Sequence, residues 1–303
     1  MVFLSMLVRR LRALPLSAPL LVAACTGVFF QPMRTQVLTP ADIGLTYRDL
    51  WFDADDGMRL HGWLLTTSGP SRGLLLFLHG NAENISTHIA SVAWLPAAGF
   101  AVLLFDYRGY GLSAGTPDLD GLHRDAEAAL EAAFDQPEAS PSGVAVFGQS
   151  LGGALAITAL ARSPQRHRVR ALIVEGAFAG YRSIAREVLA RSWLTWPLQW
   201  PLSLTIDNRY RPREAIGEIA PTPVLIIEGA DDPIIAPANG EALFAAAGEP
   251  KALWLASGGH IAAFRASAMQ HRLLTYLMRC AFAAEPDAAA CRGLDAAGPA
   301  PHA

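Results

Sequence analysis

Lysine is almost absent from this sequence: Lys251 is the only one in 303 residues. Arginine supplies the rest of the 24 basic residues, and 27 acidic residues balance them to a formal net charge of −3. Proteins that bind nucleic acid through its phosphates usually carry a clustered positive excess. The near-neutral balance therefore argues against a nucleic-acid partner.

Motifs that hold nucleotides or catalytic metals are missing as well. The chain has neither a Gly-x-x-x-x-Gly-Lys phosphate loop nor a Rossmann glycine string, and nucleotide enzymes depend on such turns to bind phosphate. It also lacks His-Glu-x-x-His and any other group of ligands at metal-binding spacing. We therefore expect neither a cofactor nor a bound metal.

The first 24 residues form a unit of their own. Arginines at positions 9, 10 and 12 precede an apolar run, 14–24, which contains two prolines and is too short to span a bilayer. This pattern is typical of an export signal. The run ends in LVAAC, which resembles the lipobox of bacterial lipoproteins, so we expect Cys25 to be acylated and to anchor the protein on the periplasmic side of the cell envelope. An uncleaved anchor and a released secreted protein are the alternatives.

Cysteine is scarce, with Cys25, Cys280 and Cys291 the only three. If Cys25 carries lipid, the other two remain, and a helix followed by a Pro-containing turn could bring them together. An even number of remaining cysteines is typical of a protein in an oxidising compartment, where disulfides form. The sequence therefore predicts a disulfide between Cys280 and Cys291, with two free thiols as the alternative.

The pattern of apolar residues after Cys25 predicts one α/β domain. Two β-like runs, 45–54 and 58–67, flank the turn signal DDG and suggest an opening hairpin. Short uninterrupted apolar runs then alternate with helical ones as far as residue 282. Such runs indicate a mostly parallel central sheet with helices on both faces.

The domain boundaries follow from the same pattern. We expect an export signal, a tether, one folded domain and an unstructured tail, at residues 1–24, 25–44, 45–283 and 284–303. Within the domain, a stretch with three tryptophans and three prolines interrupts the alternation at about 191–212. It is interpreted as a small cap inserted between two strands, with an ordinary packing helix as the alternative.

The pattern Gly-x-Ser-x-Gly occurs twice, around Ser113 and around Ser150. A nucleophile elbow needs a strand before the serine and a helix directly behind it. The sequence GVAVFGQSLGGALAITALA supplies both around Ser150, whereas Thr116-Pro117 stops any helix behind Ser113. Ser150 is therefore the predicted nucleophile.

In this architecture the acid and the histidine follow the serine in that order. His260 lies in the loop after the strand-like run KALWLAS, whereas His271 lies within the last predicted helix, so His260 is the predicted base. Asp232 is the preferred acid because Pro233 turns the chain directly after it, and Asp231 stays open as the alternative. Glu175, at the end of the preceding strand, is a weaker candidate.

Five motifs together resemble a known family: FLHGNAEN, FDYRGYGLS, FGQSLGG, IIEGADDPI and SGGH. In this order and spacing they are similar to the α/β-hydrolase superfamily and, within it, to the Bem46-like group with its ABHD17-type depalmitoylases. The resemblance spans about residues 45–276 and implies the α/β-hydrolase fold. It also implies a nucleophile at Ser150, an acid at Asp232 and a base at His260.

The resemblance further implies an oxyanion hole formed by the backbone N–H groups of Asn81 and Leu151. The position of this loop supports the same assignment, because a loop between a buried strand and the start of a helix can direct its amides at a developing negative charge. The side chains of His79, Asn81, Asp106 and Arg108 are expected mainly to hold loops in shape.

These observations favour a serine hydrolase that cleaves carboxylic esters or thioesters through an acyl-enzyme on Ser150. A small ester or acylated molecule is the expected substrate, and a membrane is the expected partner through the lipid anchor. A serine peptidase or amidase of the same fold is one alternative. A non-catalytic binding protein of the envelope is the other.

Overall fold

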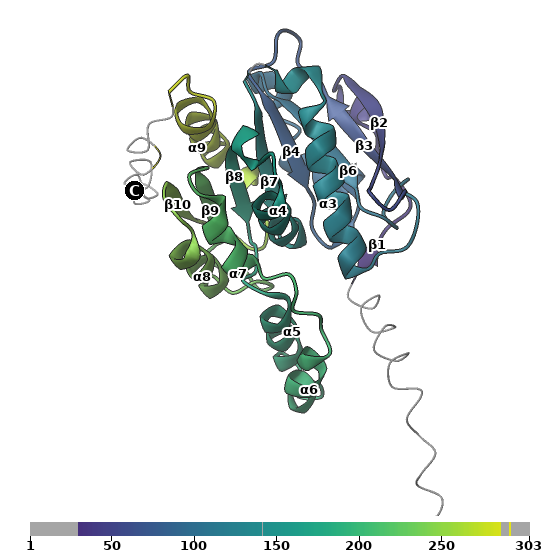
Figure 1. The fold of residues 1–303 in the computed structure, drawn as a ribbon, viewed down its shortest axis with the longest axis vertical. Coiled ribbons are helices and arrows are strands. Elements are labelled where there is room, and N and C mark those ends of the chain that lie inside the picture. The colour runs from purple at the N-terminus through teal and green to yellow at the C-terminus, as the bar shows by residue number, and fades with distance from the viewer. Residues whose placement is uncertain (1–29, 141, 286–290, 292–303) are drawn as a thin grey trace, which may run out of the picture.

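The computed structural model describes residues 30–140, 142–285 and 291. The predicted signal and the predicted lipidation site, Cys25, lie outside these residues, as does most of the predicted tail. Figure 1 shows the described chain as a central sheet with helices on both faces and a helical hairpin that extends away from them.

A single eight-stranded sheet organises the body, in the order β10-β9-β8-β7-β4-β6-β3-β2. Neighbouring strands are parallel from β10 to β6, and the pairs β3–β6 and β2–β3 are antiparallel. The predicted mostly parallel α/β sheet is therefore confirmed. The strands are β2 (Tyr47–Asp53), β3 (Arg59–Leu65), β4 (Leu74–Leu78), β6 (Ala101–Asp106), β7 (Val144–Gln149), β8 (Val169–Glu175), β9 (Val224–Gly229) and β10 (Lys251–Ala256).

The central strands are apolar at nearly every position because each face of the sheet carries its own core. In β4, Leu74, Leu76 and Leu78 pack into the core on one face, and Leu75 and Phe77 pack into the core on the other. Alternate side chains of a strand point to opposite faces, so a strand covered on both sides reads as a continuous apolar run.

Helices cover both faces of the sheet. Side chains of α3, α4 and α8 belong to the first core, and side chains of α2 and α9 belong to the second. The helices are α2 (Ile85–His88), α3 (Leu119–Phe134), α4 (Leu151–Arg162), α5 (Tyr181–Ala190), α6 (Gln199–Leu204), α7 (Pro212–Ala215), α8 (Ala238–Ala246) and α9 (Ser267–Tyr276). Short 3-10 turns lie at 40–43, 89–91, 96–98, 137–139, 166–168, 196–198, 216–219 and 263–265, and a π-helical turn follows α9 at Leu277–Ala281.

The segment predicted as a tether, 25–44, belongs to the folded body from Phe30 onward. Phe30 packs against the first core. The two-residue strand β1 (Gln31–Pro32) pairs in parallel with β5 (Ala82–Glu83), which follows β4. The side-chain amide of Asn84 donates to the carbonyls of Met33 at 3.0 Å and Thr35 at 2.8 Å. These contacts hold the N-terminal segment beside the loop at the carboxyl end of β4.

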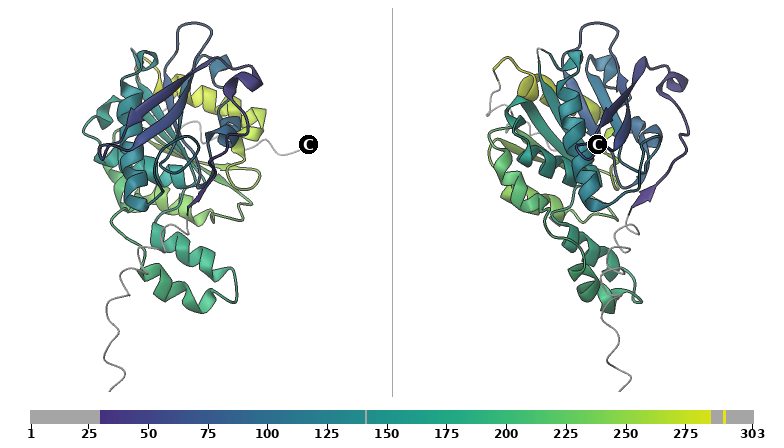
Figure 2. Two further views of the ribbon diagram at one scale, coloured as in Figure 1. Left: turned by 90° about the vertical axis from the view of Figure 1, so that its right-hand side faces the viewer. Right: turned by 45° about the vertical axis from the view of Figure 1, so that its right-hand side comes forward.

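The predicted cap is a helical hairpin that begins earlier than expected. Its first helix, α5, starts at Tyr181, ten residues before the predicted boundary at 191, and its second helix is α6. The two helices lie side by side and extend from the body in all three ribbon views (Figures 1 and 2). Sequence reasoning placed the start too late because α5 resembles an ordinary helix between two strands.

The C-terminal cysteines form a disulfide, with Cα atoms 5.3 Å apart for Cys280 and Cys291. Cys280 lies within the π-helical turn that follows α9, so the bond ties Cys291 back to the end of that helix. Within the described part of the chain, no helix has the length and apolar character needed to cross a bilayer.

Candidate active site

Ser150 occupies a sharp turn between the end of β7 and the start of α4. Its backbone has φ 54° and ψ −116°, a conformation that costs energy for a residue with a side chain and persists where the surrounding structure enforces it. A Cβ on Gly148 would lie 2.4 Å from the Gly152 carbonyl oxygen, and one on Gly152 would lie 2.1 Å from that of Leu78. Both glycines are therefore required for this turn.

Ser113, in the second Gly-x-Ser-x-Gly match, has a different environment. Its hydroxyl donates to the Asp106 carbonyl at 2.6 Å and accepts from the His61 amide at 2.9 Å. The side chain is fully buried. Ser113 thus connects a loop to two strands, and no helix starts directly behind it, since α3 begins at Leu119.

His260 and Asp232 form a hydrogen-bonded pair. Nδ1 of His260 lies 2.7 Å from Oδ2 of Asp232. Because a carboxylate only accepts, Nδ1 carries the hydrogen and Nε2 is left as the acceptor. Oδ1 of Asp232 accepts from the amides of Ile234 at 2.7 Å and Ile235 at 2.9 Å, which fixes the carboxylate, whereas Asp231 is exposed.

Gly176 brings the serine turn and the His–Asp pair together. The amide of Ser150 donates to the carbonyl of Glu175, the residue before Gly176, at 2.9 Å. A Cβ on Gly176 would lie 3.1 Å from Nδ1 of His260 and 3.5 Å from Oδ2 of Asp232. The three predicted residues therefore converge at the carboxyl ends of β7, β8 and β9.

The predicted oxyanion loop passes beside Ser150. A Cβ on Gly80 would lie 3.7 Å from Cβ of Ser150. The hydroxyl of Tyr110 donates to the carbonyl of Asn81 at 2.8 Å, which holds the loop in place. On the opposite side, Leu151 is the first residue of α4, and amides in the first turn of a helix have no carbonyl partner within the helix.

Two histidines lie behind this loop, and sequence reasoning missed one of them. His79 and His88 have ring centroids 5.3 Å apart. Burial lowers the pKa of both imidazoles, so both are neutral near pH 7. Nε2 of His88 lies 3.1 Å from the carbonyl of Ala82. His88 carries no motif, and its position within a predicted helix gave no sign that it lies near the site.

Glu175, the weaker acid candidate, accepts hydrogen bonds from two other residues near the site. Its Oε2 accepts from the side-chain amide of Gln149 at 2.7 Å, and its Oε1 accepts from the backbone amide of Ala263 at 2.9 Å. Gln149 precedes Ser150, and Ala263 lies three residues after His260. Glu175 therefore links the serine turn to the histidine loop.

Glu228 is a second buried carboxyl at this edge of the sheet. Within the described part of the chain, neither of its carboxyl oxygens has a hydrogen-bond partner. Burial, and then the nearby carboxyls of Asp232 and Glu175, raise the pKa of Glu228 to about 9. The helix α8 packs directly against it, since a Cβ on Gly240 would lie 2.3 Å from Cγ of Glu228. Glu228 is therefore neutral near pH 7.

Glu228 makes the stability of the protein depend on pH. In the unfolded chain its carboxyl ionises near its ordinary value of 4.5, and in the folded protein near 9. The stability contributed by the neutral carboxyl is therefore fully present below about pH 4.5 and is lost as the pH rises toward 9. Glu228→Gln, which stays neutral, should raise the free energy of unfolding by about 1 kcal/mol or more at pH about 8 and by almost nothing at pH about 4.

Urea denaturation at the two pH values measures this difference. Glu241→Gln, which replaces an exposed carboxyl on α8, is the matched control and should behave like the wild type at both. An equal gain from Glu228→Gln at both pH values would contradict a neutral Glu228.

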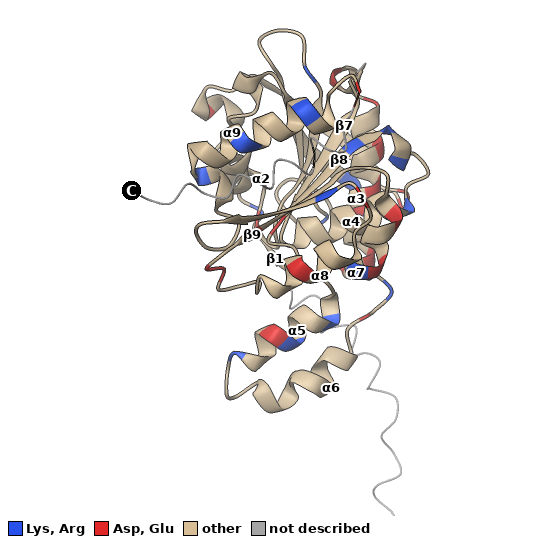
Figure 3. Ribbon diagram, turned by 90° about the vertical axis from the view of Figure 1, so that its left-hand side faces the viewer, with Lys and Arg blue, Asp and Glu red and all other residues tan. Residues whose placement is uncertain are grey.

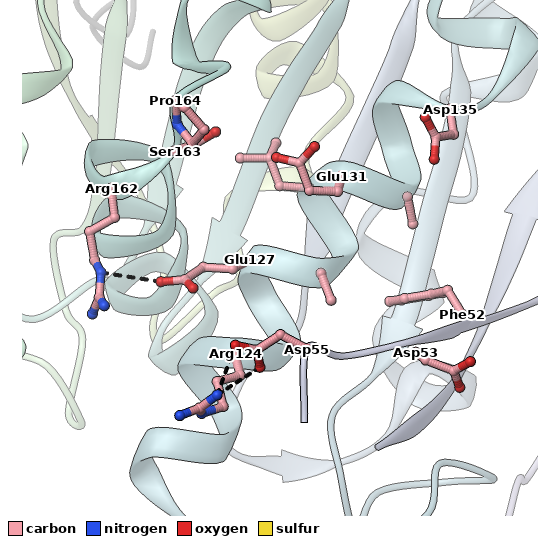
Figure 4. A pocket seen from close by; sticks show the side chains of 13 residues that line it. Phe52, Asp53, Asp55, Arg124, Glu127, Glu131, Asp135, Arg162, Ser163 and Pro164 are labelled. Carbon is pink, nitrogen blue, oxygen red and sulfur yellow. Dashed lines mark hydrogen bonds and ion pairs between the residues drawn. The ribbon is translucent and has the colours of Figure 1, made fainter. Parts of the chain in front are cut away.

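A surface hollow lies away from these residues. It has a volume of about 580 Å³ and is lined by side chains from β2, α3 and the end of α4 (Figure 4). Arg124 pairs with Asp55 at 2.8 Å, and Arg162 pairs with Glu127 at 3.3 Å, inside it. None of the predicted site residues contributes to its described lining.

Metal-binding clusters are absent from the part of the chain that the structure describes, where no three His, Cys, Asp or Glu side chains gather closely enough to hold an ion. The buried ion pairs instead hold loops, as expected for Arg108. Its guanidinium lies 2.8 Å from Asp56 and 2.7 Å from Asp125. Asp106 similarly accepts from the amide of Ile85 at 2.9 Å.

Comparison with known proteins identifies similar chains. Residues 69–215 match the family model described as serine aminopeptidase S33. The protein YfhR of Escherichia coli K12 is 37% identical over 218 residues, which cover 70% of this chain and 73% of YfhR. The protein bem46 of Schizosaccharomyces pombe is 31% identical over 234 residues, which cover 74% of each chain.

Among solved structures, the fold is similar to that of the Pyrococcus furiosus esterase Pf2001. The TM-score is 0.66, with 21% sequence identity, and the match covers 82% of this chain and 96% of the esterase. At this identity the likeness supports the arrangement of strands and helices, whereas the choice of substrate depends on the site itself.

Proposed function

Since this chain belongs to the Bem46-like group of α/β-hydrolases, we propose that it is a serine hydrolase that cleaves carboxylic esters or thioesters through an acyl-enzyme on Ser150. The observation that carries the proposal is the pairing of His260 with Asp232 beside a strained serine turn. A serine hydroxyl is a weak nucleophile unless an adjacent base takes its proton.

In the first half of the reaction, Oγ of Ser150 attacks the carbonyl carbon of the substrate, and Nε2 of His260 takes the hydroxyl proton. The carbonyl oxygen becomes an oxyanion, which accepts from the backbone N–H groups of Leu151 and Asn81. Each such donor contributes roughly 3 to 4 kcal/mol to lowering the barrier. The imidazolium then protonates the leaving alcohol or thiol as its bond to carbon breaks.

In the second half, water attacks the acyl-enzyme. His260 takes a proton from the water and returns it to Oγ of Ser150 as the acid is released. Asp232 holds the imidazole in the required tautomer and stabilises its positive charge during both halves. Each proton taken by His260 is returned within the cycle, so the residues at the site account for the chemistry without an added cofactor.

The residues around the site favour cleavage of esters or thioesters over cleavage of amides. The flanking hairpin, which would receive a peptide terminus, has few acidic groups that are not already paired. Glu187 and Glu214 are the only glutamates that flank it, and Glu187 already accepts from Asn239 at 3.2 Å. Asp207 pairs with Arg209 at 2.6 Å. The structurally similar protein Pf2001 of Pyrococcus furiosus is itself an esterase. The family model, described as a serine aminopeptidase, favours aminopeptidase activity as the second candidate.

A substrate panel separates the two candidates. With p-nitrophenyl esters of graded acyl length and aminoacyl p-nitroanilides, we expect kcat/KM for the best ester to exceed that for the best anilide by at least about tenfold, which is about 1.4 kcal/mol of barrier. A ratio in favour of the anilides would instead support the peptidase. Labelling by a fluorophosphonate that disappears in Ser150→Ala distinguishes either enzyme from a binding protein without activity.

We further propose that the protein is exported and anchored through an acylated Cys25. The support is the sequence LVAAC behind an arginine-containing apolar leader. Two or three acyl chains hold a protein firmly at a membrane, since each buried methylene contributes about 0.8 kcal/mol. Mass spectrometry of the N-terminal peptide of the mature protein tests this, and an unmodified Cys25 would contradict it.

A further inference from the structure

The hairpin tip, which we define as residues 188–206, exposes an unusual amount of apolar side chain. Trp193, Trp196 and Trp200 are 86%, 59% and 61% exposed. Large apolar side chains in the same tip that are also exposed are Val188, Leu194, Leu198, Leu202 and Leu204. Contiguous apolar surface of this kind marks a docking site, whereas single exposed apolar residues do not.

Charge is almost absent from the hairpin tip. Between Glu187 and Asp207, Arg191 is the only charged residue. Figure 3 shows charged residues on α5 and none on α6. A surface built for a soluble protein partner normally carries a polar rim, and this tip has tryptophan and leucine instead, the composition of a segment that lies in a membrane interface.

Contacts within the hairpin keep the tip in this form. The hydroxyl of Thr195 donates to the carbonyl of Leu189 at 2.6 Å, and Nε of Arg182 donates to that of Ile206 at 2.9 Å. The guanidinium of Arg186 lies 4.6 Å from the ring centroid of Trp200. The hairpin thus satisfies its own polar groups while its apolar side chains remain outside.

The tip is suited to lie in the surface of a bilayer and not to cross it. The helices α5 and α6 have 10 and 6 residues, which corresponds to lengths of about 15 and 9 Å. A helix needs about 20 apolar residues to span the hydrocarbon core. Tryptophan is favoured at the boundary between water and lipid because its ring is apolar while its N–H group can still hydrogen-bond.

The N-terminal segment leaves the body at the same edge of the sheet. The hairpin follows the carboxyl end of β8, and β1 pairs with β5 behind the carboxyl end of β4. In Figure 1, β1 and the hairpin lie at the same end of the molecule. The first described residues and the hairpin therefore lie on the same side of the molecule.

From these observations we propose that the hairpin tip inserts Trp193, Trp196 and Trp200 into the interface of a phospholipid bilayer and orients the carboxyl edge of the sheet toward that surface. The guanidinium of Arg191 donates to the carbonyl of Ile234, next to the loop of Asp232, and connects the hairpin to the site. The hairpin would attach to the bilayer independently of any lipid on Cys25. The proposal requires neither activity at Ser150 nor acylation of Cys25.

The test uses the full chain carrying Cys25→Ser and Ser150→Ala, so that neither acylation nor turnover contributes. Its binding to vesicles of phosphatidylethanolamine and phosphatidylglycerol is measured by flotation. Adding Trp193→Ser, Trp196→Ser and Trp200→Ser should weaken binding at least about tenfold, because binding scales with the apolar area that enters the interface. In the parent chain, lipids brominated on their acyl chains should quench tryptophan emission, and this quenching should be lost in the triple variant.

The matched control is Trp51→Ser, which removes a ring that is 43% exposed on β2, the outermost strand of the sheet and five strands away from β8. It should leave vesicle binding within about twofold. A single Trp193→Glu, at the most exposed ring of the tip, should reproduce most of the loss. Thermal unfolding followed by circular dichroism verifies that each variant is folded.

Two results would overturn the proposal. Equal vesicle binding by the parent chain and the triple variant would assign attachment to the N-terminal segment alone. A parent chain that forms dimers through the tip in sedimentation and does not float with vesicles would assign the surface to a second copy. Because the test chain carries Ser150→Ala, either result leaves the proposed hydrolysis unaffected.

Discussion

Replacing Ser150 with alanine is expected to lower kcat for p-nitrophenyl acetate by about 10⁴-fold or more, with little change in KM. The hydroxyl is the only protein group in the proposed mechanism that bonds to the acyl carbon, so its loss removes the acyl-enzyme route altogether. Residual hydrolysis would come from the oxyanion donors and from substrate binding. Initial rates over a range of substrate concentrations give both kcat and KM.

Ser113→Ala is the matched control, since it changes the serine of the other Gly-x-Ser-x-Gly match. It should leave kcat within about twofold while lowering the free energy of unfolding by about 1 to 3 kcal/mol, because the buried amide of His61 loses its acceptor. If Ser113→Ala abolished activity in a folded protein and Ser150→Ala did not, the assignment of the nucleophile would be wrong.

The alternation of apolar runs allowed the sheet to be predicted, because a strand covered on both faces has to be apolar at almost every position. The serine turn was predictable for a related reason. Backbone carbonyl oxygens of other residues lie where a side chain on Gly148 or Gly152 would start. Only glycine fits at these two positions, and the sequence therefore shows the constraint directly. His260 could be placed because the base follows the acid in this architecture and His271 lies within the last helix.

Features that depend on distant contacts left no such trace. The pairing of β1 with β5 involves two residues on each side, too few for a periodic pattern. Glu175 was considered as an acid, but its position between Gln149 and Ala263 depends on how two loops meet. Glu228 has the sequence context of an ordinary strand end, and its burial appears only once α8 is packed on it.

For the hairpin, the sequence showed an unusual composition but neither the exposure of its side chains nor its first residue. Three tryptophans within eight residues indicated an insertion. Whether such rings face the body or the solvent depends on where the helices dock, and their exposure of 59% to 86% was not predictable. The start at Tyr181 was missed because α5 has the periodicity of a helix that covers a sheet.

The sequence also left two adjacent aspartates open, and the structure makes them distinguishable. Asp232 accepts from the imidazole of His260 and from two backbone amides, whereas Asp231 is exposed. Asp232→Asn is therefore expected to lower kcat by about 10⁴-fold. An asparagine that keeps its carbonyl on the two amides presents N–H to Nδ1, which forces the hydrogen onto Nε2, the nitrogen that has to accept the proton of Ser150.

Asp231→Asn removes the same charge one residue away and should leave kcat within about twofold, since an exposed charge is screened by water. The comparison therefore separates control of the tautomer from a general effect of negative charge near the site. A pH profile adds a second readout. In Asp232→Asn the imidazolium loses its carboxylate partner, so the remaining activity should require a higher hydroxide concentration and rise steadily with pH, without the plateau expected of the wild type. Equal losses in both variants would mean that charge near His260, and not the orientation of its ring, is what the aspartates provide.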